Sequence, residues 1–285
     1  MKHHRPIPAI LIAALIVCLL GVVLIIISWK ALVLDFAESE FRAVFNGSSV
    51  RIGSRDITPG TLVFRDIDIT TMGRQFLKIK EFRLSFTIPS LLRDRAAGFY
   101  MEEAVVYDKL KIPEARGLAK YAKDTLAIDN VFARTLSGVV EGGAMIKTGK
   151  TSYYSVALKL KDIQLEKVAE AFKLNEKIDI TGFVSGSIEL SGEGFALTRL
   201  EGKFEASDKG GTLTIKNKEW LDAIALYAKQ DVNMIAENFK SYRYDKGNAS
   251  LGLEGTNIII DAHLEGVAGK RDLSVSLHDF NKKGR

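Results

Sequence analysis

The chain has 285 residues, of which 47% are hydrophobic and 26% charged, and its mean hydropathy is +0.06. This composition excludes a disordered or a fibrous chain. The single cysteine, Cys18, excludes a disulfide framework and any zinc or iron–sulfur site built from cysteines. The formal net charge of +5 is spread along the chain, so it does not indicate a nucleic-acid partner.

The most apolar segment lies at the N-terminus. Ile7 to Ile27 is 21 residues long and carries no charge, and as a helix it would span about 30 Å, the hydrocarbon thickness of a bilayer. Lys2 and Arg5 precede it, so the positive-inside rule predicts a cytoplasmic N-terminus. The alternative is a cleavable signal peptide, but the run is longer than such a peptide's apolar region and no small-x-small site follows. We therefore expect residues 1–30 to be a cytoplasmic stub and a single-pass transmembrane anchor.

The segment after the membrane is predicted to be helical and then to change to strands. Apolar and acidic residues alternate at helical spacing over residues 31–46, which predicts a juxtamembrane amphipathic helix. Beyond it, apolar residues recur at every second position. The strands predicted in this part are Thr61 to Thr70, Gln75 to Ile88 and Gly98 to Tyr107. The second of them changes phase at Lys80-Glu81, as a β-bulge would cause, and a short helix or turn follows at Pro89.

The same period continues to the C-terminus. The strands predicted there are Arg134 to Lys147, Thr151 to Lys161, Ile178 to Ser191, Leu197 to Ser207, Gly211 to Lys216, Tyr242 to Glu254, Asn257 to Glu265 and Arg271 to Phe280. The apolar phase of Ile178 to Ser191 runs without a break. Two amphipathic helices interrupt the strands, a short one at Leu165 to Phe172 and a longer one at Glu219 to Phe239. The turns between the last strands carry the Gly and Asn residues that hairpins require.

These elements predict a mainly β (α+β) fold, in which an N-terminal transmembrane helix precedes a long curved antiparallel β-sheet. The strand-rich domain would cover residues 47–285, with a sub-boundary near residue 130. Its alternation is one-sided, so the sheet has one apolar and one polar face. Glycines in the apolar phase would permit strong curvature; they are Gly138, Gly142, Gly182 and Gly186. Such a sheet could close as a barrel, pair as a sandwich, or remain a taco-like groove with an apolar floor.

An open groove would offer its apolar residues to a lipid. The candidate lipid-groove residues are Val140, Ile146, Val156, Leu158, Leu160, Ile178, Ile180, Val184, Ile188, Leu190, Leu200, Phe204, Leu213 and Ile215.

Motifs of catalytic and metal sites are missing from the sequence. It contains no GxxxxGK[ST], HExxH or GxSxG pattern. His263 and His278 are the only histidines beyond the anchor, and each lies singly on a predicted polar strand face. Asp66 and Asp68 alternate with isoleucines, which favours a solvated strand face over a calcium loop. We therefore predict no enzyme, no cofactor and no metal.

Four segments carry a resemblance to a known family. They are GSSVRIG at Gly47 to Gly53, FVSGSIELSG at Phe183 to Gly192, LEGKFEASDKGGTLTI at Leu200 to Ile215, and GKRDLSVSLHDF at Gly269 to Phe280. They resemble the AsmA-like superfamily, in particular YdbH-type (dicarboxylate-transport-domain) proteins. The resemblance implies a repeating β-groove, a bacterial inner-membrane anchor with a periplasmic domain, and phospholipid transport between the inner and outer membranes. It implies no catalytic residues.

The length of the chain limits what one copy can do. About fourteen strands at roughly 4.8 Å give a trough of at most about 65 Å, well short of a diderm envelope gap. We therefore expect phospholipid as a ligand and another envelope protein as a partner that extends the groove. The alternative is a structural or assembly scaffold of the envelope with a closed, self-filled core.

Overall fold

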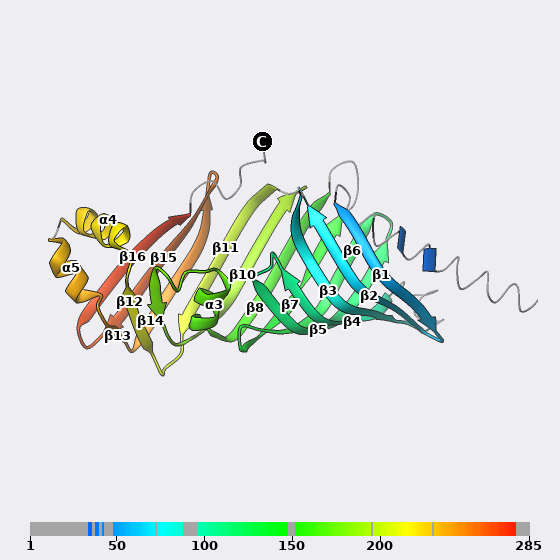
Figure 1. The fold of residues 1–285 in the computed structure, drawn as a ribbon, viewed down its shortest axis with the longest axis horizontal. Helices are drawn as coiled ribbons and strands as arrows, with labels where there is room; N and C mark the ends of the chain where they lie inside the picture. The colour runs from blue at the N-terminus through cyan, green and yellow to red at the C-terminus, as the bar shows by residue number, and fades with distance from the viewer. Residues whose placement is uncertain are drawn as a thin grey trace, which may run out of the picture.

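The computed structural model describes residues 34–35, 38–39, 42, 48–71, 73–87, 96–147, 152–194, 196–229 and 231–277. Its main body is a 13-stranded sheet in which the strands follow one another in chain order and pair antiparallel (Figure 1). The strands of this main sheet are β1 (Ser49–Thr58), β2 (Thr61–Thr71), β3 (Arg74–Ser85), β4 (Ala96–Val106), β5 (Leu110–Ala122), β6 (Thr125–Thr135), β7 (Gly138–Lys147), β8 (Tyr153–Gln164), β10 (Phe183–Glu193), β11 (Ala196–Ala206), β14 (Lys246–Glu254), β15 (Asn257–Gly266) and β16 (Gly269–Leu277). The predicted mainly β fold with a long antiparallel sheet is therefore confirmed.

The remaining elements are inserted into this meander. A small sheet has the strand order β13-β12-β9. Its strands and the helices are α3 (Leu165–Ala171), β9 (Ile178–Ile180), β12 (Gly211–Ile215), α4 (Lys218–Ala228), α5 (Val232–Asn238) and β13 (Tyr242–Tyr244). Figure 1 shows α4 and α5 beyond the C-terminal strands, at the end of the molecule opposite β1.

The strand registers keep apolar residues on one face of the main sheet. Ile188 on β10 lies opposite Leu158 on β8, and Leu190 lies opposite both Val156 and Leu200. Since neighbouring side chains on one face are the units that stabilise a sheet, these pairs explain why the one-sided alternation specifies the register.

The alternation of buried and exposed residues along the strands shifts by one position at single residues with a left-handed backbone. Ile79 is buried and Phe82 packs on the same core, so the predicted phase change of β3 is present. The register is the same on both sides of it, however, and the partner residue Asp66 on β2 has φ 53°. The cause is therefore not an extra residue in β3. Since a left-handed residue rotates the following peptide unit, both paired strands change phase together.

This device recurs along the sheet. Asp66, Glu103, Asn130 and Asp162 have φ values of 53°, 48°, 52° and 53°, and they lie on β2, β4, β6 and β8. Asp and Asn tolerate the left-handed region better than most residues. Each of these residues lies inside a strand, so the shift of the alternation takes place within the sheet and not in a turn.

Two buried clusters lie at the two ends of the main sheet. The N-terminal cluster consists of Val50, Ile57, Leu62, Phe64, Ile67, Ile69, Ile79 and Ala104. The C-terminal cluster joins the small sheet and α4–α5 to the main sheet, and consists of Leu213, Ile215, Leu221, Ala225, Ile235, Phe239, Tyr242, Tyr244 and Leu264. Each end of the molecule therefore has a small buried core of its own.

Three predicted elements are divided in the structure. The predicted helix Glu219 to Phe239 is two helices, because Lys229 adopts φ 50° at the end of α4 and the Asp231 side chain then accepts a hydrogen bond from Asn233 N to start α5. The predicted strand Ile178 to Ser191 is β9 and β10, which belong to different sheets, because Gly182 has φ 116°.

The third division is between β13 and β14, at Asp245, within the predicted strand Tyr242 to Glu254. In addition, Leu136 lies in a turn with φ 50° rather than on the strand predicted from Arg134. Strand β7 therefore begins only at Gly138.

Some expectations fall outside the described residues. These are the anchor at residues 7–27 and the helix or turn after residue 88. Of the expected juxtamembrane helix, residues 34, 35, 38, 39 and 42 are described and helical. No helix in the described ranges is long and apolar enough to cross a membrane.

Candidate functional site

An apolar strip lies on the main sheet between the two buried clusters. It is formed by the apolar-face residues of β6, β7, β8, β10 and β11, which are Leu126, Ile128, Val131, Val140, Ile146, Val156, Leu158, Leu160, Val184, Ile188, Leu190 and Phe204. Every one of them is only half-buried. By contrast, Phe64, Ile67 and Ile69 in the N-terminal cluster are 0–1% exposed. The described residues thus leave an aliphatic surface partly uncovered in the middle of the molecule.

Glycines keep the floor of this strip low. A Cβ added to Gly186 would lie 2.1 Å from the carbonyl oxygen of Lys203, and one added to Gly142 would lie 2.1 Å from that of Ala157. Only glycine fits such close backbone contacts. The strands therefore approach each other more closely at these two points than a side chain would allow.

Two aromatic rings lie over such glycines. The Phe204 ring is within 3.1 Å of the Cβ positions of both Gly186 and Gly202, and the Tyr154 ring covers Gly192 in the same way. An aromatic ring that packs over a strand glycine shields the backbone and lies flat against the sheet. The Phe204 ring therefore forms part of the apolar surface of the sheet instead of filling the groove.

Most of the predicted groove residues lie together. Nine of them are in the strip itself, and Leu200, which is 7% exposed, lies beside Leu190 at its C-terminal side. The other four, Ile178, Ile180, Leu213 and Ile215, belong to the small sheet and pack in the C-terminal cluster. The structure therefore places these four in a self-filled core and not along the strip, because Gly182 turns the chain out of the main sheet.

The prediction omitted the strip residues of β6. These residues are Leu126, Ile128 and Val131. The left-handed Asn130 lies between the second and the third, so the alternation shifts by one position there. A search for two alternating runs joined at an Asn or Asp would have found them.

The opposite face of the sheet is charged. Ion pairs join neighbouring strands there, such as Lys161 with Glu141 at 2.8 Å and Lys120 with Asp129 at 3.0 Å. A hollow of about 630 Å³ lies over Gly143 and Ala157 on this face. Within the described part of the chain, no group of three or more His, Asp and Glu residues is arranged to hold a metal ion.

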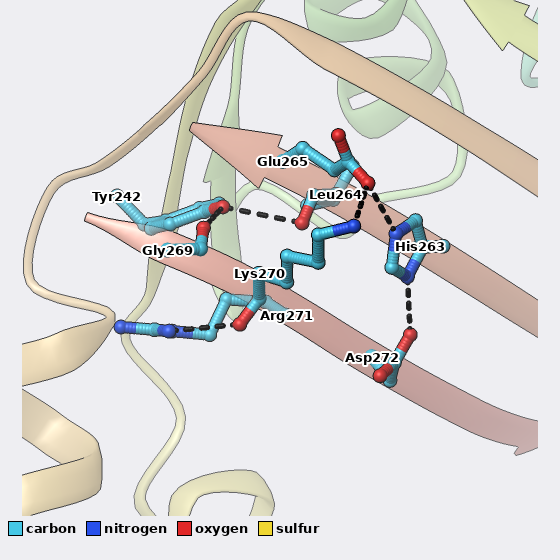
Figure 2. Close-up of polar contacts among 8 residues, drawn as sticks. All are labelled: Tyr242, His263, Leu264, Glu265, Gly269, Lys270, Arg271 and Asp272. Atoms are coloured by element: carbon cyan, nitrogen blue, oxygen red, sulfur yellow. Dashed lines mark hydrogen bonds and ion pairs between the residues drawn. The ribbon is translucent and has the colours of Figure 1, made fainter. Parts of the chain in front are cut away.

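A polar cluster joins the last two strands (Figure 2). His263 Nδ1 lies 2.5 Å from Asp272, and its Nε2 lies 3.1 Å from Glu265, which also pairs with Lys270 at 2.6 Å. The hydrogen bonds to Asp272 and Glu265 raise the pKa of His263, and the Lys270 and His263 hydrogen bonds lower the pKa of Glu265 to about 2. The partners satisfy both histidine nitrogens, and the contacts of His263 with Asp272 and of Glu265 with Lys270 join β15 to β16. The cluster is therefore a cross-strand clamp.

Comparisons with protein-family models, with curated proteins and with solved structures find no significant match to this chain.

Proposed function

We propose that this chain is a membrane-anchored, periplasmic lipid-binding β-groove protein that takes part in phospholipid transport between the inner and outer membranes. The observation that carries the proposal is the half-exposed apolar strip between two filled clusters. Large contiguous apolar surfaces on soluble domains are uncommon and mark binding sites. A scaffold with a closed core would bury these side chains as fully as the two ends of the sheet bury theirs.

The chemistry of the strip suits an acyl chain. The lining named above is aliphatic apart from Phe204, and Tyr154, at one end of the same face, donates its hydroxyl to the carbonyl oxygen of Ala196. Each CH₂ moved from water to such a surface contributes about 0.8 kcal/mol. The five strands of the strip span about 19 Å at roughly 4.8 Å per strand, a distance that suits one long acyl chain lying across them.

The sequence supplies the location. The apolar run from Ile7 to Ile27 would hold the chain in the bacterial inner membrane, and the resemblance to AsmA-like proteins agrees with a periplasmic domain. Because one copy is short, another envelope protein would extend the groove. This reading requires no catalytic residue, so the chain would act as a carrier and not as an enzyme.

A transfer assay tests this function. The full chain, reconstituted in donor vesicles, should accelerate the movement of a fluorescent phospholipid to acceptor vesicles. Val184→Lys with Ile188→Lys should reduce the rate to the background level, because two charges would lie in the strip. Ser187→Lys with Glu189→Lys, at two exposed positions on the opposite face of β10, is the matched control and should leave the rate unchanged. Equal rates for all three proteins, or for vesicles without protein, would contradict the proposal.

A further inference from the structure

The polar face of the main sheet carries two hollows next to each other. One, of about 630 Å³, lies over Gly143 and Ala157 and borders β6, β7, β8 and β10. The other, of about 510 Å³, borders β11, β14, β15 and β16. Strand pairing joins the two, because Ser187 at the first hollow lies opposite Lys203 at the second. We call the two hollows together the polar groove.

One row of polar side chains borders both hollows. The strand register places its members directly opposite one another on neighbouring strands, and they are Glu141, Lys159, Ser187, Lys203, Ser250 and Asp261. Phe132 on β6 and Ser274 on β16 extend the row at its two ends. The eight strands crossed in this way span about 34 Å at roughly 4.8 Å per strand. A site of this length suits a linear polymer.

The charges that border the polar groove cancel. Three carboxylates are paired with a basic side chain of the protein, and the pairs are Glu141 with Lys161 at 2.8 Å, Glu189 with Arg199 at 3.9 Å, and Asp272 with His263 at 2.5 Å. Two more, Glu205 and Asp261, are balanced by Lys159 and Lys203 along the same groove. A nucleic acid or another polyanion needs an excess of positive charge, which these residues do not supply.

The polar groove is also a poor fit for a peptide. Bound peptides commonly pair with a free sheet edge, lay apolar side chains into a groove, or bring a phosphate group to an arginine cluster. Every strand that borders the polar groove except β16 is paired along both edges. Hydroxyl groups, by contrast, both donate and accept hydrogen bonds, so a sugar can use carboxylate, ammonium and serine side chains alike.

An aromatic wall stands at the β6 end of the polar groove. The Phe132 ring borders the first hollow, and the guanidinium group of Arg116 lies 4.9 Å from the centre of that ring and holds it in place. Beside it, Gly143 and Ala157 form a floor without long side chains. A sugar ring has C–H groups that pack on such a wall and floor, and hydroxyl groups that reach the polar rim.

We propose that the polar groove binds a neutral, extended glycan, a chain of β-1,4-linked pyranose rings. Such a chain is straight, so it can follow the row of polar side chains from one hollow into the next. Its C–H faces would lie on Phe132 and Ala157, and its hydroxyl groups would meet the charged side chains. Because this groove lies on the opposite face of the sheet from the apolar strip, the inference goes beyond lipid binding and does not depend on it.

Calorimetric titration tests this site. The full chain in detergent is titrated with two β-1,4-linked hexasaccharides, chitohexaose and cellohexaose, which differ in the acetamido group. At least one of them should bind, and several-fold more tightly than its own disaccharide, because only the longer chain reaches both hollows. High salt should change this affinity little, because the ligand carries no charge. No binding of either hexasaccharide, equal binding of the disaccharide, or tighter binding of an extended peptide of mixed sequence would overturn the proposal.

Tryptophan substitutions locate the binding. Ala157→Trp fills the first hollow and Ser250→Trp the second, and both positions are exposed, so the sheet can accommodate the larger side chain. Each change should weaken hexasaccharide binding several-fold. Ser85→Trp, at an exposed position of β3 outside both hollows, is the matched control and should leave binding unchanged, with circular dichroism as the check on folding. Unchanged affinity in both hollow variants, or an equal loss in Ser85→Trp, would overturn the proposal.

Discussion

At the scale of single residues, the strip depends on side chains that are apolar but not enclosed. Ile188 lies between Leu158 and Gly202, so one of its neighbours is a glycine without a side chain. A fully enclosed isoleucine would tolerate no charge, whereas a half-exposed one has a path to water. Substitutions along the strip therefore separate an open groove from a closed core.

We predict that Ile188→Lys keeps the fold and loses the ligand. The lysine stem can lie along the strip while its ammonium group reaches solvent, so the free energy of unfolding should fall by no more than about 1–2 kcal/mol. Denaturant unfolding measures that change, with Ser187→Lys on the other face as the control. A chain that fails to fold only in the Ile188 variant would show that the site is a closed core.

The His263 clamp should make stability depend on pH. The pKa of His263 is raised from 6.5, so its contribution is complete below that value and is lost as the pH rises through the folded-state pKa. The pKa of Glu265 is lowered from 4.5 to about 2, so its contribution is present above 4.5 and is lost as the pH falls toward 2. The clamp is therefore complete between about pH 4.5 and 6.5.

The measurement is the melting temperature of the wild type and of His263→Gln across this range. The difference between the two proteins should be largest near pH 6 and should shrink as the pH rises. High salt should reduce it at every pH, because the cluster is exposed. A difference in melting temperature that does not change with pH would show that the protonation of His263 does not contribute to stability.

At the scale of elements, the sequence predicted strands best where every apolar position holds a large side chain. β8 is of this kind, with Val156, Leu158 and Leu160, and α3 was predicted nearly to its bounds. β5 was missed, because Pro113 interrupts it and its apolar face carries the small residues Ala115, Gly117 and Ala119.

The separation of β9 from β10 into two sheets could not be predicted from the sequence, for a different reason. The pattern of Ile178 to Leu190 continues in phase across Gly182, and only the tertiary contacts of β9 with β12 separate the two strands. Periodicity reports which residues are buried, and it cannot report against which layer they pack. For this reason, four candidates predicted to line the groove lie in the small sheet instead: Ile178, Ile180, Leu213 and Ile215.

We predict that the small sheet is held by the Tyr244 hydroxyl. This group donates a 2.7 Å hydrogen bond to the carbonyl oxygen of Thr181, in the segment between β9 and β10, and the side chain is 1% exposed. Burial raises its pKa to about 12, so it stays neutral. Tyr244→Phe should lower the free energy of unfolding by about 1–3 kcal/mol, because the buried carbonyl loses its partner.

Hydrogen exchange locates the effect of this change. Amides of β9 and β12 should exchange faster in Tyr244→Phe, while those of β2 and β3 at the other end should not. Tyr154→Phe is the matched control, because its hydroxyl makes a longer 3.3 Å bond and the side chain is half-buried. Faster exchange throughout the chain would indicate that the small sheet does not open independently.

At the scale of the whole molecule, the buried clusters do not close off the strip. Half-buried apolar residues continue on the same face of β14, β15 and β16, at Leu251, Ile260 and Val275. Leu251 lies opposite Gly202 on β11, so this surface is continuous with the strip. The partly uncovered apolar surface therefore extends from β6 to β16, which suits the passage of a lipid along the sheet.

The most direct test of the central claim, that an acyl chain lies on the apolar strip, is photo-crosslinking from adjacent positions of β10. A photoreactive residue at position 188 faces the strip, and one at position 187 faces the charged surface, so each controls for the other. We predict that the full chain in its native membrane yields a phospholipid adduct by mass spectrometry at position 188 and none at position 187. Equal adducts at both positions, or none at position 188 in a folded protein, would contradict it.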